Sequence, residues 1–265
     1  MLDFQFKDCY DMQDLLNIMR VLRSPDGCPW DAKQTHESIK KNLIEETYEV
    51  IEAINKKDEV LLCEELGDLL MQIVFHSQME EDAGTFEFNN VTDGICKKLI
   101  ERHPHVFGEV EISGVDDVLT NWDAIKRKSK GQKTTEESML SVPKELPALM
   151  RATKLQKKAA DVGFDWNDVS GALDKIGEET AELKAAIANN DINNMSEELG
   201  DLLFSVVNVS RFIKVDAEEA LTAASDKFLA RFAEVEKLAN KRGIDMKAST
   251  IEELDALWDE VKKQK

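Results

Sequence analysis

The sequence is poor in the residues that interrupt helices, with 12 glycines and 5 prolines among its 265 residues. An all-β protein needs many turns, and turns depend on these two residue types, so their scarcity argues against that class. Aromatic residues make up only 6% of the chain, whereas hydrophobic residues reach 42%. This composition favours a soluble, helix-rich protein.

Cysteine and long apolar runs are also scarce. The four cysteines are scattered along the first half of the chain and include no CxxC pair, which is typical of reduced thiols rather than of a disulfide framework. No uninterrupted apolar stretch approaches the roughly 18 residues of a membrane span. The first residues lack the basic and apolar regions of a signal peptide. We therefore expect a cytoplasmic protein that does not enter a membrane.

Positive charge is in short supply. Lysine and arginine number 34 against 53 aspartates and glutamates, and the formal net charge is −19. This deficit speaks against a surface that binds nucleic acid or acidic lipid. It does not exclude an anionic ligand, because a metal ion and a few local bases can reverse the field at a site.

What the chain does have is an acidic pattern that occurs twice, once in each half. The first copy runs from Glu45 to Leu70 and the second from Glu178 to Leu203; each begins with EET and ends with EELGDLL. Every acid of the second copy follows its counterpart by 133 residues (178 − 45 = 133). An internal repeat of this kind predicts two structural units of the same design.

On a helix, acids three or four residues apart lie on one face. Glu179 with Glu182, and Glu198 with Asp201, are therefore expected to point from two antiparallel helices into one space. Carboxylates that face each other repel unless a cation lies between them, and ligation by oxygen alone favours Mg²⁺ or Mn²⁺ over zinc. The alternative is a solvated acidic helix face.

Each copy also has a glycine within its EELGDLL segment, Gly67 in the first and Gly200 in the second. A glycine in the middle of a helix costs about 1 kcal/mol relative to alanine. We expect close approach of a second helix, or a tightly held ligand, to offset this cost.

Basic residues repeat beside the acids. Each half has a Lys–Arg pair at i, i+4 and a Trp–Lys pair one helical turn apart: Lys98 with Arg102, Trp122 with Lys126, Lys227 with Arg231, and Trp258 with Lys262. Arginine and lysine suit phosphate oxygens, although such residues also form surface ion pairs or cover apolar surface. Together, a metal, a polyphosphate and an aromatic ring indicate nucleotide hydrolysis by a metal-activated water. The GxxxxGK[ST] loop of P-loop enzymes is missing from the sequence.

Residues 128–147 shift in composition towards Lys, Ser, Thr, Gly and Pro and show little apolar periodicity, which is typical of a linker. On either side, apolar residues recur at helical spacing and no segment has the alternation of a strand. We therefore predict an all-α protein of two tandem helical-bundle domains, residues 1–127 and 148–265, joined by this linker.

These residues resemble the MazG family of all-α nucleoside triphosphate pyrophosphohydrolases, whose hallmark is EExxE followed by ExxD. The matching acids are Glu45, Glu46, Glu49, Glu65 and Asp68 in the first copy and Glu178, Glu179, Glu182, Glu198 and Asp201 in the second. Three further stretches resemble the two-domain bacterial form of the family: GCPWDxxQTHxS at 27–38, VPKELPALMRA at 142–152 and VGFDW at 162–166.

The resemblance implies Mg²⁺-dependent hydrolysis of nucleoside triphosphates to monophosphate and pyrophosphate, with broad base tolerance and Mn²⁺ as a possible substitute. It also implies an interleaved homodimer and a role in cleaning the nucleotide pool or modulating ppGpp. By this resemblance the catalytic residues are Glu178, Glu179, Glu182, Glu198 and Asp201, and the last four of these hold the metal. The residues implied to bind the nucleotide are Lys175, Glu179, Glu197, Lys227, Arg231, Trp258 and Lys262.

Motif content alone would allow two active sites, because the first copy keeps all its acids. It differs in having Asn42 where the second copy has Lys175, and in the His103-Pro104-His105 that follows Arg102. The preference for the second copy therefore rests on the resemblance. Two other classes stay open: a di-iron carboxylate bundle, although no glutamate here is followed by histidine three residues later, and a non-catalytic Mg²⁺-binding helical dimer that acts through a protein partner.

Overall fold

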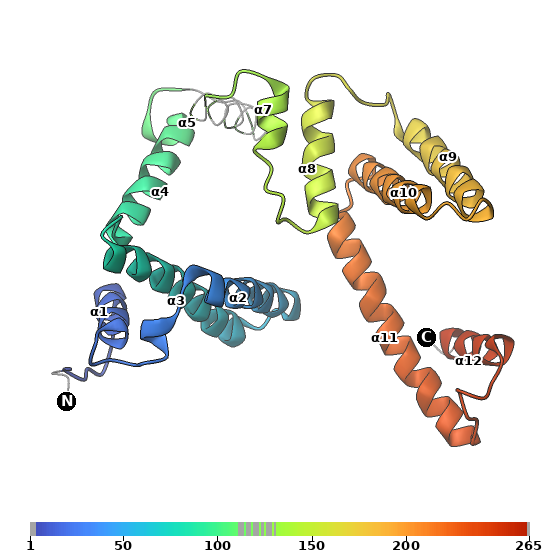
Figure 1. The fold of residues 1–265 in the computed structure, drawn as a ribbon, viewed down its shortest axis with the longest axis horizontal. Helices are drawn as coiled ribbons and strands as arrows, with labels where there is room; N and C mark the ends of the chain where they lie inside the picture. The colour runs from blue at the N-terminus through green and yellow to red at the C-terminus, as the bar shows by residue number, and fades with distance from the viewer. Residues whose placement is uncertain are drawn as a thin grey trace. The chain divides into compact units, whose positions relative to one another are not determined.

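The computed structural model describes residues 4–110, 114, 118, 122, 125, 129 and 131–263, and helices make up nearly all of its regular structure (Figure 1). Within these residues no strand occurs. The chain divides into two compact units, Met1–Lys126 and Arg127–Lys265. The prediction of an all-α protein with two tandem helical repeats is confirmed.

The first unit is built around the pairing of two long antiparallel helices. Its helices are α1 (Met12–Arg23), a short 3₁₀ turn (Asp31–Lys33), α2 (His36–Lys56), α3 (Glu59–Ala83), α4 (Phe88–Arg102) and α5 (Pro104–Phe107). Helix α1 packs across α3, and α3 packs along α2. Their contact is an apolar core of five buried side chains: Met19, Ile39, Val74, Phe75 and Met79.

The second unit repeats this plan and extends it. Its helices are α7 (Thr135–Leu140), α8 (Ala148–Ala160), α9 (Val169–Ala188), α10 (Ile192–Phe212), α11 (Ala217–Arg242) and α12 (Ile251–Lys263). Helix α9 pairs with α10 as α2 pairs with α3, and α8 packs on α10 as α1 packs on α3. Helix α12 folds back on α11.

The two helical hairpins begin and turn at equivalent residues. The N-cap of α2 is Thr35 and that of α9 is Asp168, which are 133 residues apart (168 − 35 = 133). In each case the side-chain oxygen accepts a hydrogen bond from a backbone N–H of the first turn, which satisfies a donor that the helix itself leaves unpaired. The hairpin turns likewise place Lys57 and Asn190 in the left-handed region, with φ of 55° and 53°. The repeat is thus a repeat of local structure.

Helices α11 and α12 form a separate apolar cluster within the second unit. Val235 and Ala239 of α11 pack against Leu257 and Val261 of α12, and all four are buried. This contact determines where the basic and aromatic residues of the two helices lie.

The range predicted as a linker, 128–147, contains helix α7 and is partly packed. Ser138 and Val142 are buried, and α7 lies against α8. The beginning of this range, residues 128 and 130, lies outside the described residues, as do the predicted domain end at 127 and Lys126 of the predicted Trp–Lys pair. In the described part of the chain, none of the helices has both the length and the apolar character of a membrane-spanning segment.

We expect Leu257→Ala to loosen α12 from α11, because truncating a buried leucine removes apolar contacts and leaves a cavity. The expected loss is about 2–5 kcal/mol of unfolding free energy for this helix pair. Hydrogen exchange of the α12 amides, together with chemical unfolding of the whole chain, measures it. Leu140→Ala, at a residue of α7 that is 73% exposed, is the control and should change little. Equal exchange in the two variants would contradict the packing.

Candidate functional site

Carboxylates of α9 and α10 converge in the second unit. Carboxylate oxygens of Glu179, Glu198 and Asp201 lie within 4.8 Å of one another, and so do those of Glu178, Glu179 and Glu182. Glu179 belongs to both groups and is only 3% exposed. The structure therefore brings together all five acids that the sequence singled out, around one buried glutamate.

The electrostatics of this cluster are unfavourable. Partial burial raises the pKa of the Glu198 carboxyl, and the neighbouring Glu182, Glu179 and Asp201 raise it further. Negative charge is difficult to hold at this position because water is partly excluded and other carboxylates face it. A positive charge in the cluster would relieve both effects.

Lys175 supplies one such charge. Its Nζ lies 2.5 Å from Oε1 of Glu179 and 2.9 Å from Oε1 of Glu178. Both glutamates are about one turn further along the same helix. These two carboxylates raise the pKa of Lys175 above its usual value. The lysine therefore remains an ammonium, and Glu179 is buried with a charged partner.

The donor set suits a hard divalent cation. It consists of carboxylate oxygens from two helices, and no sulfur or imidazole is among the converging groups of the described residues. Such a set matches Mg²⁺ or Mn²⁺. It stays a prediction that the cation is bound by four carboxylates, those of Glu179, Glu182, Glu198 and Asp201.

The first unit has a similar cluster without the lysine. Oxygens of Glu46, Glu49 and Glu65 lie within 4.8 Å of one another. Burial raises the pKa of Glu46 and of Glu65, and Asp68 contributes to both shifts. Asn42 stands where Lys175 stands in the second unit, so this cluster lacks the internal ammonium.

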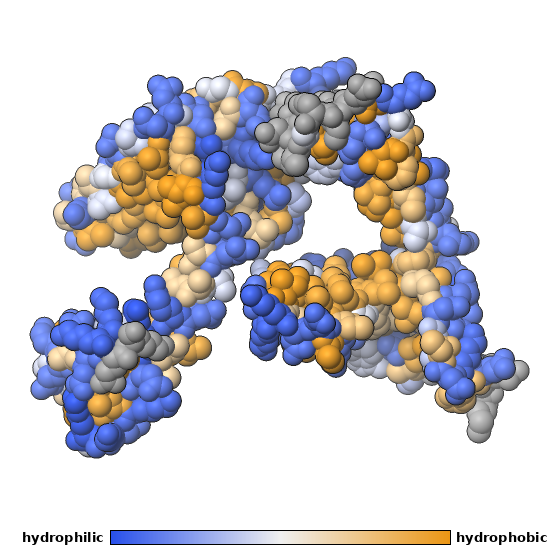
Figure 2. All heavy atoms as spheres, turned by 180° about the vertical axis from the view of Figure 1, so that it is seen from behind, coloured by the Kyte–Doolittle hydropathy of each residue, from blue (hydrophilic) through white to orange (hydrophobic). Residues whose placement is uncertain are grey.

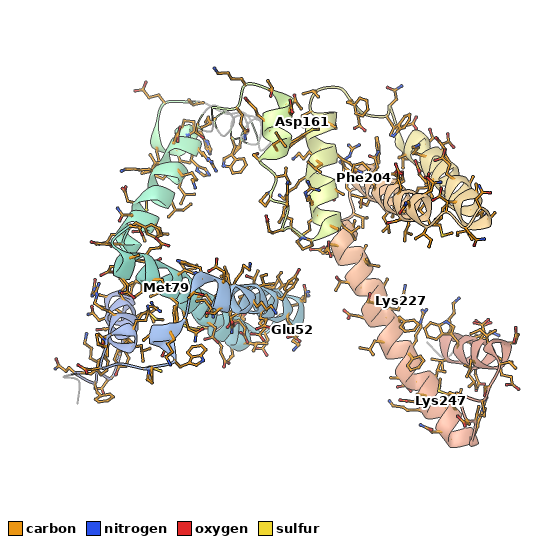
Figure 3. The ribbon with its side chains drawn as sticks, in the orientation of Figure 1. Glu52, Met79, Asp161, Phe204, Lys227 and Lys247 are labelled. Carbon is orange, nitrogen blue, oxygen red and sulfur yellow. The ribbon has the colours of Figure 1, made fainter. Side chains whose placement is uncertain are left out.

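The basic and aromatic residues of the second unit lie together on α11 and α12. The Arg231 guanidinium lies 5.9 Å from the centroid of the Trp258 ring, and Phe228 lies 5.3 Å from the same ring. Figure 3 labels Lys227 on α11, and it labels Phe204 on α10, the helix that carries the acids Glu198 and Asp201. Among the described residues, neither Lys227, Arg231 nor Lys262 forms an ion pair with the carboxylates of α9 and α10. A single chain therefore assembles the acids and the distant bases as two separate groups.

The remaining candidates occupy more exposed positions. Glu197 and Glu178 are exposed, as is Glu45 in the first unit. Arg102 of the first unit lies with its guanidinium 5.0 Å from the Trp122 ring, an arrangement like that of Arg231 and Trp258. This similarity extends the repeat beyond the acidic hairpins.

The close approach of a second helix that was expected at Gly67 and Gly200 is wrong within the chain, whereas a tightly held ligand at these glycines stays a prediction. A Cβ at either position would meet no atom of the described residues within 4 Å. Helix α2 and helix α9 therefore do not approach these glycines closely. The close approach occurs instead at Gly171, where a Cβ would come within 2.7 Å of the Trp166 ring.

Asn208 and Arg211 of α10 are not among the predicted site residues. The Arg211 guanidinium forms two hydrogen bonds with the Asp165 carboxylate, one of 2.8 Å, and so ties the α8–α9 loop to α10. This contact holds the pKa of Asp165 below its usual value. The sequence does contain a signal for Asn208, because this polar residue of α10 occupies the repeat position that Phe75 occupies in α3.

The raised pKa of Glu198 leads to a pH-dependent effect on stability. Because the folded protein binds this proton more tightly than the unfolded chain does, Glu198 opposes folding as the pH rises through its raised pKa. Without divalent metal, we expect Glu198→Gln to unfold at a higher temperature than the unmodified protein near neutral pH. The difference should shrink as the pH falls and Glu198 becomes protonated.

Thermal unfolding followed by circular dichroism in a chelating buffer, from about pH 4 to about pH 8, measures this difference. Glu252→Gln, at an exposed residue in the first turn of α12, is the control. A lower unfolding temperature for Glu198→Gln at neutral pH would contradict the repulsion.

A protein-family model and several known proteins match this chain. The model of the MazG nucleotide pyrophosphohydrolase domain matches residues 34–107 and 168–235, one segment in each unit. The "Nucleoside triphosphate pyrophosphohydrolase/pyrophosphatase MazG" of Thermotoga maritima is 46% identical over 250 residues, 94% of this chain and 95% of the relative. The "Nucleoside triphosphate pyrophosphohydrolase" of Escherichia coli K12 is 44% identical over 253 residues, 94% of this chain and 96% of the relative.

A third relative, "Uncharacterized protein YabN" of Bacillus subtilis, is 47% identical over 255 residues, and the match covers 52% of that longer protein. The matched segments begin one residue before the N-cap of α2 and at the N-cap of α9, so they include both acidic hairpins. On these grounds the chain belongs to the MazG nucleotide pyrophosphohydrolase family.

Proposed function

We propose that the second unit hydrolyses nucleoside triphosphates to nucleoside monophosphate and pyrophosphate with the help of Mg²⁺. The observation that carries this proposal is the convergence of the α9 and α10 carboxylates around buried Glu179, with Lys175 beside them. Family membership and the relatives named as nucleoside triphosphate pyrophosphohydrolases identify the chain as a hydrolase that acts on acid anhydrides.

Glu179, Glu182, Glu198 and Asp201 would hold the metal. When bound, Mg²⁺, or Mn²⁺ in its place, neutralises phosphate charge and lowers the pKa of a coordinated water. The chain's own contribution is to hold these oxygens in place on two paired helices, so that little rearrangement is needed. A carboxylate of the cluster that is not fully engaged, such as exposed Glu178, can accept the proton of the attacking water.

Basic residues supply the charges that the departing phosphates need. Lys175 already lies at the carboxylates and can turn towards a phosphate oxygen once a metal takes its place beside Glu179. Lys227, Arg231 and Lys262 add three further cations on α11 and α12, where the Trp258 ring supports the Arg231 guanidinium. Glu197 lies next to Glu198, one of the proposed metal ligands, and faces solvent, where it can contact the ribose or a second cation.

The same reasoning favours the second copy over the first. Both clusters have converging glutamates, but Asn42 gives the first cluster no ammonium for a phosphate. The proposed substrate range is broad in the base, and the proposed cellular role is removal of surplus nucleotides, with an influence on ppGpp.

We expect Glu179→Gln and Asp201→Asn each to lower turnover at least about a hundredfold, because even indirect disturbance of a metal site costs about ten- to a hundredfold. Pyrophosphate and monophosphate released from the four common nucleoside triphosphates are measured with Mg²⁺ present. Helicity is checked by circular dichroism. Glu46→Gln, the equivalent of Glu179→Gln in the first unit (179 − 133 = 46), is the matched control and should retain activity.

Near-normal pyrophosphate release by both second-unit variants would overturn the assignment of the metal site. Release of diphosphate and inorganic phosphate instead would mean attack at the γ-phosphate. A folded, unmodified protein with no product from any nucleotide would favour the alternative, a helical dimer that binds Mg²⁺ and acts through a protein partner.

A homodimer accounts for the apolar surface of the second unit. Figure 2 shows apolar side chains gathered over the α9–α10 pair, at the upper left. Six large apolar residues on α9, α10 and α11 are 41–67% exposed: Leu173, Leu199, Leu203, Leu221, Leu229 and Phe232. Exposed patches of this kind mark interfaces. In an interleaved dimer, α11 and α12 of one copy can carry their bases to the carboxylates of the other.

We expect sedimentation to give a mass about twice the 30.0 kDa of one chain. Leu229→Lys, at a residue that is 67% exposed on α11, should weaken association because it puts a charge into the apolar contact. Leu140→Lys, at a residue that is 73% exposed on α7, is the control. A monomeric unmodified protein with full activity would contradict the dimer.

A further inference from the structure

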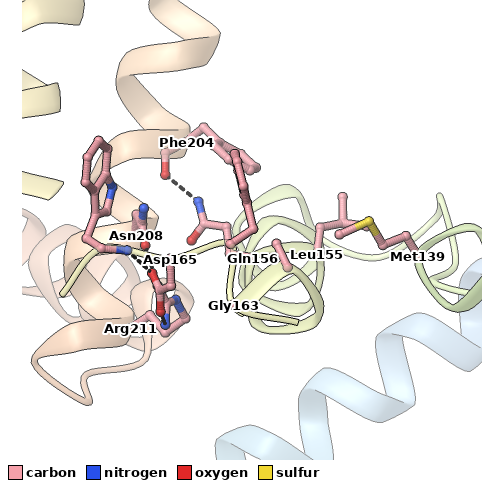
Figure 4. A pocket seen from close by; sticks show the side chains of 11 residues that line it. Met139, Leu155, Gln156, Gly163, Asp165, Phe204, Asn208 and Arg211 are labelled. Atoms are coloured by element: carbon pink, nitrogen blue, oxygen red, sulfur yellow. Dashed lines mark hydrogen bonds and ion pairs between the residues drawn. The ribbon is translucent and has the colours of Figure 1, made fainter. Parts of the chain in front are cut away.

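A cavity of about 480 Å³ lies between α8, the α8–α9 loop and α10 of the second unit (Figure 4). Apolar side chains make most of its wall, chiefly Leu155 and Ala159 of α8, Phe204 of α10, and Phe164 and Trp166 of the loop. Met139 of α7 closes one edge. Its size falls in the range of small-molecule sites.

Two amide side chains and one ion pair provide the polar part of this wall. Gln156 is only 7% exposed, and its Nε2 donates to the Phe204 carbonyl at 2.8 Å. Its Oε1 is buried and finds no hydrogen-bond partner within the described residues. A buried acceptor without a partner costs free energy, and a rotation of this amide towards a donor in the cavity would recover it. The amide of Asn208 also lines the cavity. The hydrogen bond between Arg211 and Asp165 holds the α8–α9 loop, which forms one wall of the cavity, against α10.

The aromatic wall depends on one glycine. Trp166 lies directly against α9 at Gly171, where a Cβ would approach its ring to 2.7 Å. Any larger residue at this position would displace the indole. Gly171 thus leaves the space that the flat Trp166 ring occupies at the edge of the cavity.

The cavity lies next to the carboxylate cluster on both helices. Asn208 follows Asp201 by seven residues, nearly two full turns, so the two side chains share a face of α10 about 10 Å apart. Gly171, with Trp166 against it, precedes Glu179 by eight residues on α9, and Lys175 lies between them. Because α9 and α10 run antiparallel, both spacings extend towards the same end of the hairpin.

We propose that this cavity receives the base of the nucleoside triphosphate whose phosphates lie at the carboxylates, with Trp166 and Phe204 as apolar walls and Asn208 and Gln156 as its polar contacts. This inference rests on the proposed function. A base is flat, has an apolar face and carries donors and acceptors on its edge. Aromatic walls and amide groups, which both donate and accept, match that chemistry without demanding one base.

The first unit shows what happens when this space is filled. Phe75 has the position of Asn208 (208 − 133 = 75) and is 3% exposed. Met19 of α1 packs against it in the apolar core, and the Arg23 guanidinium lies 5.4 Å from its ring centroid. The first copy therefore keeps its carboxylates but has side chains where the second copy has room for a base.

Asn208→Phe places the first copy's residue into the second copy's cavity and tests the assignment in the full-length protein. We expect the KM for ATP, GTP, CTP and UTP to rise about ten- to a hundredfold, because stacking of the base is lost. Mn²⁺ binding, measured by electron paramagnetic resonance without nucleotide, should be unchanged, since the carboxylates are untouched. Asn193→Phe makes the same chemical change at an exposed residue of α10 and should leave both quantities unaltered.

Asn208→Leu keeps a side chain of similar size and removes the amide, together with the hydrogen bond that its Oδ1 accepts from Arg211 at 2.8 Å. We expect a smaller rise in KM, about two- to tenfold, which differs between the bases because their edges differ. Unchanged KM values in both Asn208 variants would overturn the base site. A KM rise in Asn208→Phe with an equal loss of Mn²⁺ affinity would also overturn it, since the carboxylates would then be the cause. If the unmodified protein released no pyrophosphate from any nucleotide, the proposed function would fail instead.

Discussion

Repulsion between carboxylates on two paired helices is the constraint on which the site depends. The α9–α10 hairpin brings five acids to one place and buries one of them, Glu179, which is unfavourable unless positive charge accompanies it. Lys175 provides such a charge within the chain, and a divalent cation would provide more. The helices can hold this arrangement because apolar residues on their other faces pair them and because their caps and turn are well formed. The free energy of packing thus offsets the cost of gathering like charges.

The two units share one helical hairpin, α2–α3 in the first and α9–α10 in the second, but its surroundings differ. Val74 and Val207, at equivalent positions, are both fully buried, so the helices pair in the same way. Beside them the first unit places Phe75 and fills a core, whereas the second places Asn208 and leaves a cavity. Asn42 and Lys175 differ in the same sense, since only the second carries a charge suited to phosphate. A few substitutions at the margin of a shared hairpin therefore separate a well-packed unit from one with room for a ligand.

Much of this could be predicted from the sequence, because it depends on local periodicity. The helices, their antiparallel pairing and the convergence of acids follow from spacing of three and four residues and from the repeat at 133. The roles of Gly67 and Gly200 could not, since whether a glycine contacts a second helix depends on packing that spacing does not specify. Nor did composition reveal that α7 lies within residues 128–147 and packs on α8, because tertiary contacts there outweigh weak local signals.

By itself, the sequence determined the helical class, the tandem repeat and the set of acids that meet, because each is encoded by spacing along one or two helices. The resemblance to the family came from its motifs. Only the tertiary structure decided which of these acids is buried, that Lys175 is paired with it, and that the bases of α11 and α12 form a separate group in one chain. It also disclosed the cavity beside α8, whose walls come from four segments between residues 139 and 211. The physical reason is that burial, ion pairing and empty space arise between elements, and the distances between elements depend on how all their side chains pack together.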